Sequence, residues 1–128
     1  MKPLQITTDE FIARVAEEGI LILDFWASWC GPCRVFGPVF DAAAERHADI
    51  TWGKVDTEEQ ADLASALHIT SIPTLMVFRD GILLLEQPGA VAASVLDEIV
   101  AKVRAIDMDE LRRRIDGRHS ADRAAPGP

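Results

Sequence analysis

Polar and apolar residues in the first part of the chain follow two different patterns. Apolar side chains recur at helical spacing over residues 11–16, after Thr7, which stands three residues before Glu10 as in a capping box. Residues 20–26 then form an apolar run interrupted only by Asp24. This run is too short for an ordinary helix and predicts a strand covered on both faces, as in a parallel sheet.

The rest of the chain continues this alternation and adds a hairpin. Asp80-Gly81 separates two apolar runs, and this dipeptide favours a two-residue turn between antiparallel strands. The further expected elements are a helix beginning at or near Cys33, a strand over 50–55, a helix capped by Thr57 and ending near Leu67, strands over 74–78 and 82–85, and a helix over 92–105.

Two of these helices are expected to bury one side against the sheet. Pro38 interrupts the first of them, which predicts a kink rather than a stop. The expected buried side chains are Val35, Phe36, Val39, Phe40 and Ala43 in the first, and Val95, Leu96, Ile99, Val100 and Val103 in the second.

The element order β-α-β-α-β-α-β-β-α predicts an α/β fold with a mixed, mostly parallel central sheet and helices on both faces. We expect one domain over residues 1–106. A stripe of Met108, Leu111 and Ile115 predicts a short extra helix over 107–116, and the small and polar residues of 117–128 predict a disordered tail.

Composition narrows the function classes. The 128 residues suit a single domain, and a net charge of −8 disfavours attraction to nucleic acid or anionic lipid. No apolar run reaches the length of a membrane span. The start of the chain lacks the apolar segment of a secretory signal, so we expect a cytoplasmic protein. We also expect a monomer.

The two cysteines of the chain lie in Trp29-Cys30-Gly31-Pro32-Cys33, after the buried strand and at the start of a helix. A thiol attacks a disulfide only as the thiolate, and a helix N-terminus stabilises that negative charge. Pro32 suits a first helical turn, and Gly31 allows close approach of another backbone. We expect an exposed, reactive Cys30 and a less exposed Cys33 that resolves a mixed disulfide.

Asp24 is the second candidate. An ionised carboxylate in an apolar strand is costly to bury, so its pKa should be raised. It either faces water at the strand end or acts as a buried proton acceptor for Cys33. A metal site is disfavoured, because zinc normally takes four ligands and His47, His68 and His119 repeat no ligand spacing.

The stretch Asp24-Phe25-Trp26-Ala27-Ser28-Trp29-Cys30-Gly31-Pro32-Cys33 resembles the active site of the thioredoxin family. The resemblance continues through Pro38, Val55-Asp56, Ser71-Ile72-Pro73-Thr74, Asp80-Gly81 and Pro88-Gly89-Ala90, and it covers about residues 4–105. It implies the thioredoxin fold and a general protein-disulfide reductase that binds no cofactor. It also implies recycling by a thioredoxin reductase that draws on NADPH, and disulfide-containing client proteins as partners.

The resemblance assigns roles to residues. Cys30 would be the nucleophile, Cys33 the resolving thiol in a redox-active disulfide with Cys30, and Asp24 the proton-transfer group. Pro73 would be a cis-proline opposite the disulfide, with the Ile72 backbone pairing to an extended substrate. Trp26 would pack beneath the site. The substrate-docking surface would comprise Trp29, Gly31, Pro32, Ile72, Pro73, Gly89 and Ala90.

One departure concerns the lysine that some thioredoxins place near the buried aspartate. That position aligns here with Trp52, and Lys54, two residues on, shares its face of the strand. Whether Lys54 reaches Asp24 stays open. Two other function classes also remain: an oxidant or isomerase on the same scaffold, and a non-catalytic assembly factor presenting the apolar face around Trp29.

Overall fold

A single mixed sheet forms the centre of the molecule. The computed structural model describes the backbone of residues 2–124 and the side chains of residues 2–118. The strand order is β1-β3-β2-β4-β5, with β1, β3 and β2 parallel and β4 and β5 antiparallel to their neighbours. The strands are β1 (Leu4–Gln5), β2 (Ile20–Trp26), β3 (Thr51–Asp56), β4 (Thr74–Arg79) and β5 (Ile82–Pro88).

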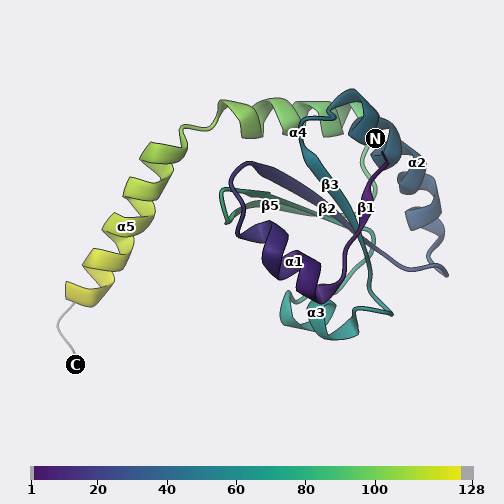
Figure 1. The fold of residues 1–128 in the computed structure, drawn as a ribbon, viewed down its shortest axis with the longest axis horizontal. Coiled ribbons are helices and arrows are strands. Elements are labelled where there is room, and N and C mark those ends of the chain that lie inside the picture. The colour runs from purple at the N-terminus through teal and green to yellow at the C-terminus, as the bar shows by residue number, and fades with distance from the viewer. Residues whose placement is uncertain (1, 125–128) are drawn as a thin grey trace.

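Helices cover both faces of this sheet, as the element order predicts (Figure 1). One face packs against α2 and α4, and the other packs against α1 and α3. The helices are α1 (Thr8–Val15), α2 (Gly31–Arg46), α3 (Ala61–Ala66), α4 (Ala93–Ala105) and α5 (Met108–Ala124). Within the part of the chain that the structure describes, none of these helices combines the length and hydropathy of a membrane crossing.

β2 is the central strand, and its alternating side chains enter two separate cores. Ile22 packs with Phe36 and Phe40 on the α2 side, whereas Leu23 and Phe25 pack in the core on the α1 side. This two-sided burial explains why the sequence of β2 is almost continuously apolar. It also places Asp24 on the face of Ile22, beneath α2.

Several local predictions are confirmed. Thr7 caps α1 by accepting a hydrogen bond from the backbone N–H of Glu10 at 3.2 Å. Asp80 and Gly81 both have positive φ, as a two-residue hairpin turn requires. Thr57, in contrast, does not cap α3. Its hydroxyl donates to the backbone oxygen of Trp26, and α3 begins later, at Ala61.

Two side chains expected in the core lie outside it. The exposed fraction of Val35 is 71% and that of Val95 is 39%. Each immediately precedes a fully buried residue, Phe36 and Leu96, and consecutive helical residues point about 100° apart. The stripe facing the sheet is therefore narrower than the pattern predicts.

The C-terminal helix is longer than the expected 107–116. It continues through Gly117 to Ala124, and residues 125–128 of the expected disordered tail lie outside the described residues. Intrahelical ion pairs of Arg112 with Asp109 and of Arg114 with Glu110 support its first turns. Beyond its contact with the domain, α5 extends away from the sheet (Figure 1).

Candidate active site

The two cysteines lie where β2 has ended and α2 begins. Cys30 is the N-cap residue of α2, and Cys30 and Cys33 form a disulfide with a Cα–Cα distance of 5.2 Å. The Cys30 sulfur also accepts a hydrogen bond from the backbone N–H of Cys33 at 3.2 Å. This donor and the positive end of the helix dipole would stabilise a thiolate on Cys30 once the disulfide is reduced.

The geometry of the motif differs from the prediction in two details. The helix begins at Gly31 rather than near Cys33, so Pro32 falls within its first turn. The exposed fractions of Cys30 and Cys33 are 4% and 5%, so the expected difference in exposure is absent in the disulfide form. Both cysteines are therefore largely covered in the disulfide form.

A second loop lies against the disulfide. The Ile72–Pro73 peptide bond is cis, as the resemblance implies, and the Ile72 carbonyl oxygen lies 3.7 Å from the Cys30 sulfur. The backbone N–H of Gly89 donates to the Pro73 oxygen at 2.7 Å, which brings Gly89 beside this loop. Of the expected docking residues, Trp29, Gly31, Pro32, Gly89 and Ala90 are exposed, Ile72 is half-buried and Pro73 is buried.

The two tryptophans beside the motif have different environments. Trp29 has an exposed fraction of 64%, and its indole N–H donates to the Glu58 carboxylate. Trp26 packs against the small cluster of Ala27, Cys30 and Cys33, as expected for a residue beneath the site. Its indole nitrogen is buried without a hydrogen-bond partner among the described residues.

Asp24 is buried rather than facing water. Its exposed fraction is 1%, and its Oδ1 atom has no hydrogen-bond partner among the described residues. Removal from water raises the pKa of Asp24 to about 7, against the opposing effect of Lys54, and the negative charge of Asp41 raises it further. A carboxyl group with this pKa can accept or release a proton near neutral pH.

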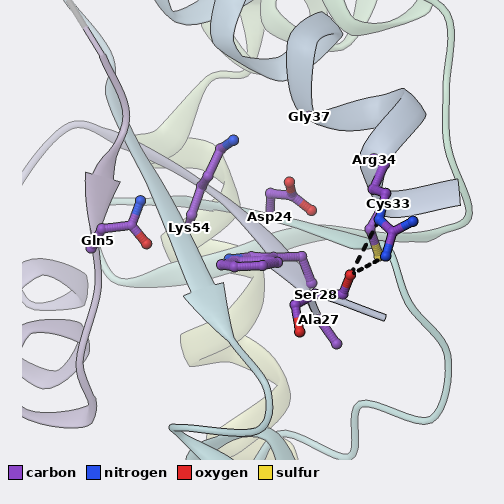
Figure 2. Close-up of a pocket in the computed structure, with 9 residues that line it drawn as sticks. Gln5, Asp24, Ala27, Ser28, Cys33, Arg34, Gly37 and Lys54 are labelled. Atoms are coloured by element: carbon purple, nitrogen blue, oxygen red, sulfur yellow. Dashed lines mark hydrogen bonds between the residues drawn. The ribbon is translucent and has the colours of Figure 1, made fainter. Parts of the chain in front are cut away.

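A cavity of about 440 Å³ connects this carboxyl to the cysteine motif. Figure 2 shows the Asp24 side chain between Lys54 on β3 and Cys33 at the start of α2. The Arg34 guanidinium closes one side by donating to the Ser28 oxygen at 2.8 and 3.2 Å. Residues that line the cavity include Gln5, Asp24, Cys33, Arg34, Gly37 and Lys54.

Strand register settles which residue of β3 faces Asp24. Asp24 pairs with Lys54, whereas Trp52 pairs with Ile22, two residue pairs closer to the start of the strands. Trp52 therefore does not occupy the place opposite Asp24. Lys54 itself lies opposite the buried carboxylate, although its ammonium is ion-paired to Asp41 at 2.8 Å.

The cysteine motif by itself does not indicate three residues of this site: Arg34, Gly37 and Asp41. Their spacing could have indicated two of them. Cys33, Gly37 and Asp41 follow one another at intervals of four in α2 and so lie on one stripe of the helix. That stripe faces the cavity and Lys54.

The histidines lie elsewhere. His47 is near the end of α2 and contacts the Asp97 carboxylate at 2.9 Å, and His68 has a positive φ after α3. The side chain of His119 lies outside the described residues. Across the described part of the chain, no three His, Cys, Asp or Glu side chains gather as metal ligands would.

Comparisons with known proteins agree with this geometry. The thioredoxin family model matches residues 2–105. A protein named putative thioredoxin 2 of Streptomyces coelicolor is 44% identical over 112 residues, which cover 88% of this chain and 84% of the relative. Thioredoxin 1 of Synechococcus elongatus is 42% identical over 99 residues, which cover 76% of this chain and 92% of the relative.

Solved structures show the same likeness. The structure of the Malassezia sympodialis thioredoxin Mala s 13 matches 80% of this chain and 91% of that one, with a TM-score of 0.72 and 30% sequence identity. The chain belongs to the thioredoxin family and is a protein-disulfide oxidoreductase that works by thiol–disulfide exchange.

Proposed function

We propose that Cys30 is the nucleophile and Cys33 the resolving thiol of this exchange. A Cys30 thiolate would attack one sulfur of a client disulfide, forming a mixed disulfide and releasing the other client sulfur as a thiolate. Cys33 would then attack the Cys30 sulfur, which frees the client as a dithiol and leaves the Cys30–Cys33 disulfide. The hydrogen bond from the Cys33 N–H to the Cys30 sulfur supports this division of roles, because it favours negative charge on Cys30.

Asp24 is proposed as the proton acceptor for the resolving thiol. Cys33 and Asp24 line the same cavity, and the pKa of Asp24 near 7 suits a base that works at neutral pH. The S–H bond of Cys33 would break as an O–H bond forms on the carboxyl, directly or through a water molecule. The carboxylate would thereby supply the Cys33 thiolate when it is needed.

The client would dock across Trp29, Gly31, Pro32, Ile72, Pro73, Gly89 and Ala90. The Ile72 backbone, whose oxygen lies 3.7 Å from the Cys30 sulfur, would pair with an extended client segment. Backbone pairing carries no side-chain identity, so it accounts for action on many disulfides. Recognition would then depend on whether the client can present an extended segment beside its disulfide.

Reducing equivalents would come from NADPH through a thioredoxin reductase, with the protein acting as a monomer in the cytoplasm. A reducing compartment fits this role, because the dithiol must be regenerated after each turnover. The experiment is coupled NADPH oxidation with purified thioredoxin reductase and insulin as the disulfide substrate. Sustained oxidation that depends on this protein is expected, and none above the reductase alone would contradict the proposal.

Two variants test the roles of the cysteines. Cys30→Ser should not attack insulin, whereas Cys33→Ser should attack it once and remain as a mixed disulfide, visible by non-reducing electrophoresis and mass spectrometry. Full activity of Cys30→Ser would overturn the assignment. Capture of one partner regardless of thiols would favour an assembly factor, and a measured redox potential like that of oxidising enzymes would favour an oxidant or isomerase.

A further inference from the structure

The ammonium of Lys54 lies against α2, next to three of its residues. It forms an ion pair with Asp41 at 2.8 Å and lies 6.0 Å from the centre of the Phe40 ring. Gly37 also borders it, since a Cβ atom there would stand 3.7 Å away, an ordinary contact distance. Figure 2 shows the Lys54 side chain beside Asp24. Although Lys54 is register-paired with Asp24, its ammonium is ion-paired to Asp41 of α2.

Among the described groups around Asp24, Lys54 is the cation whose position most affects the charge state of the carboxyl. From α2, the titratable groups facing the cavity are Cys33 and Arg34, with Asp41 behind Lys54. Arg34 is already engaged by the Ser28 oxygen, and the β4 residue paired with Asp24 is the apolar Leu75. A change in the position of the Lys54 ammonium would therefore act directly on the buried carboxylate.

We propose that Asp41 is a positioning residue of the active site, which competes with Asp24 for the Lys54 ammonium and thereby keeps Asp24 a strong enough base for Cys33. The inference deepens the proposed function and rests on the proposed role of Asp24. Asp41 is half exposed, with 51% of its side chain accessible, so water weakens its ion pair and the ammonium can exchange between the two carboxylates. An ammonium shared with Asp24 would favour the ionised carboxylate and weaken it as a base.

The first test is the titration of the Asp24 carboxyl, followed by carbon NMR in the disulfide form. Asp41→Asn should lower the midpoint from about 7 by about one pH unit, because Lys54 then turns to Asp24. Asp41→Glu, which keeps the charge, should restore most of the original midpoint. Glu98→Gln, which removes an exposed carboxylate from α4, is the matched control and should leave the midpoint unchanged.

A double-mutant cycle separates positioning from the charge of Asp41 itself. In a Lys54→Gln background, Asp41→Asn should shift the midpoint by less than a third of its effect in the natural chain. An equal shift in both backgrounds would overturn the proposal, because Asp41 would then act only through its own charge. No shift in the natural chain would overturn it as well.

Activity separates this inference from the proposed function. The pH at which the mixed disulfide is resolved half-maximally should fall in Asp41→Asn by the same amount as the Asp24 midpoint. If the carboxyl midpoint falls but the pH profile of resolution stays in place, Asp41 positions Lys54 as inferred and Asp24 is not the proton acceptor. If neither moves while insulin is still reduced, the inference fails and the function stands.

Discussion

At the carboxyl end of β2, two buried polar atoms, Asp24 Oδ1 and Trp26 Nε1, have no hydrogen-bond partner among the described side chains. At the amino end of the same strand, polar groups are engaged by several partners. Arg79 donates to three backbone oxygens at the end of α4, and Asp80 accepts from the Gly19 N–H while pairing with Arg112. The same sheet thus has one end at which buried polar groups lack hydrogen-bond partners. At the other end, called the tied end below, polar groups are hydrogen-bonded or ion-paired.

The two ends of β2 therefore differ in role. The carboxyl end carries the groups proposed to react, and the amino end carries contacts that stabilise the fold. A buried polar atom without a partner costs stability, and here such atoms lie only beside the cysteines among the described residues. An unpaired carboxylate keeps a raised pKa and remains available for proton transfer. The polar groups at the amino end of β2 take no part in the proposed proton transfer. Their hydrogen bonds and ion pairs therefore do not impair it.

The largest expected effect is at Asp24. Its pKa is about 7 in the folded protein against an ordinary 3.8, so the folded state binds more protons and its stability falls as pH rises through this window. Ionising the buried group costs about 4 kcal/mol above pH 7, and Asp24→Asn should recover about 2 to 4 kcal/mol of it. Urea melts should show this gain at pH 8 and almost none at pH 4.

The same variant should slow insulin reduction near neutral pH. The control is Leu75→Val, which changes the β4 residue paired with Asp24 and leaves the Asp24 carboxyl in place. Its effect on stability should not depend on pH. An Asp24→Asn protein less stable than the natural chain at pH 8 would mean that the carboxylate is paired or hydrated, and the contrast between the two ends would be lost.

The second effect is at the tied end. Arg79→Ala would leave backbone oxygens of Val103 and Ile106 without their donor, and we expect a loss of about 2 kcal/mol in the free energy of unfolding. Insulin reduction at 25 °C should be unchanged, because the cysteines lie at the other end. Arg79→Lys keeps a donor and should lose less. A fall in the rate of exchange would contradict the separation of the two ends.

A smaller effect is expected for the contact that holds α5. Asp80→Asn keeps the acceptor for Gly19 and tolerates the positive φ, but it removes the ion pair with Arg112. The pair is partly exposed, so the loss should be about 0.5 to 1 kcal/mol. Hydrogen exchange should show faster opening of the first turns of α5, and unchanged exchange there would mean that Met108 packing alone anchors the helix.

The smallest effect concerns the exposed ion pair of Asp49 and Arg104. The hydrogen bond from Arg104 holds the pKa of Asp49 below its ordinary range. Arg104→Gln should return the NMR titration of Asp49 toward its ordinary value without a measurable change in melting temperature. A clear loss of thermal stability would show that surface pairs contribute more to the tied end than their exposure suggests.

Much of the fold followed from residue order alone. The strand of residues 20–26, the Asp80-Gly81 hairpin and the Thr7 cap depend on local patterns and are confirmed. The predicted cap of α3 was wrong because a neighbour elsewhere in the chain decided the outcome. Thr57 donates to Trp26 instead of capping α3.

In the candidate site, too, some residues could be recognised from the sequence and others only from the fold. The cysteine motif and Asp24 could be singled out because their residue types are unusual in their places. Asp41 is less conspicuous: only its helical spacing from Cys33 on α2 indicates it, and its partner is evident only once strand β3 brings Lys54 beneath it. The roles of Asp24, the cysteines and the docking residues stay predictions until the variants are measured.

Residue order alone is enough to predict the alternation of strands and helices, the position of a dithiol at a helix start, and a carboxylate within an apolar strand. These depend on side-chain periodicity and on chemistry confined to a few neighbouring residues. The three-dimensional fold is needed to see that Lys54 faces Asp24 and yet pairs with Asp41. Strand register and helix placement depend on contacts between distant segments, and an ammonium pairs with whichever carboxylate the fold brings within reach.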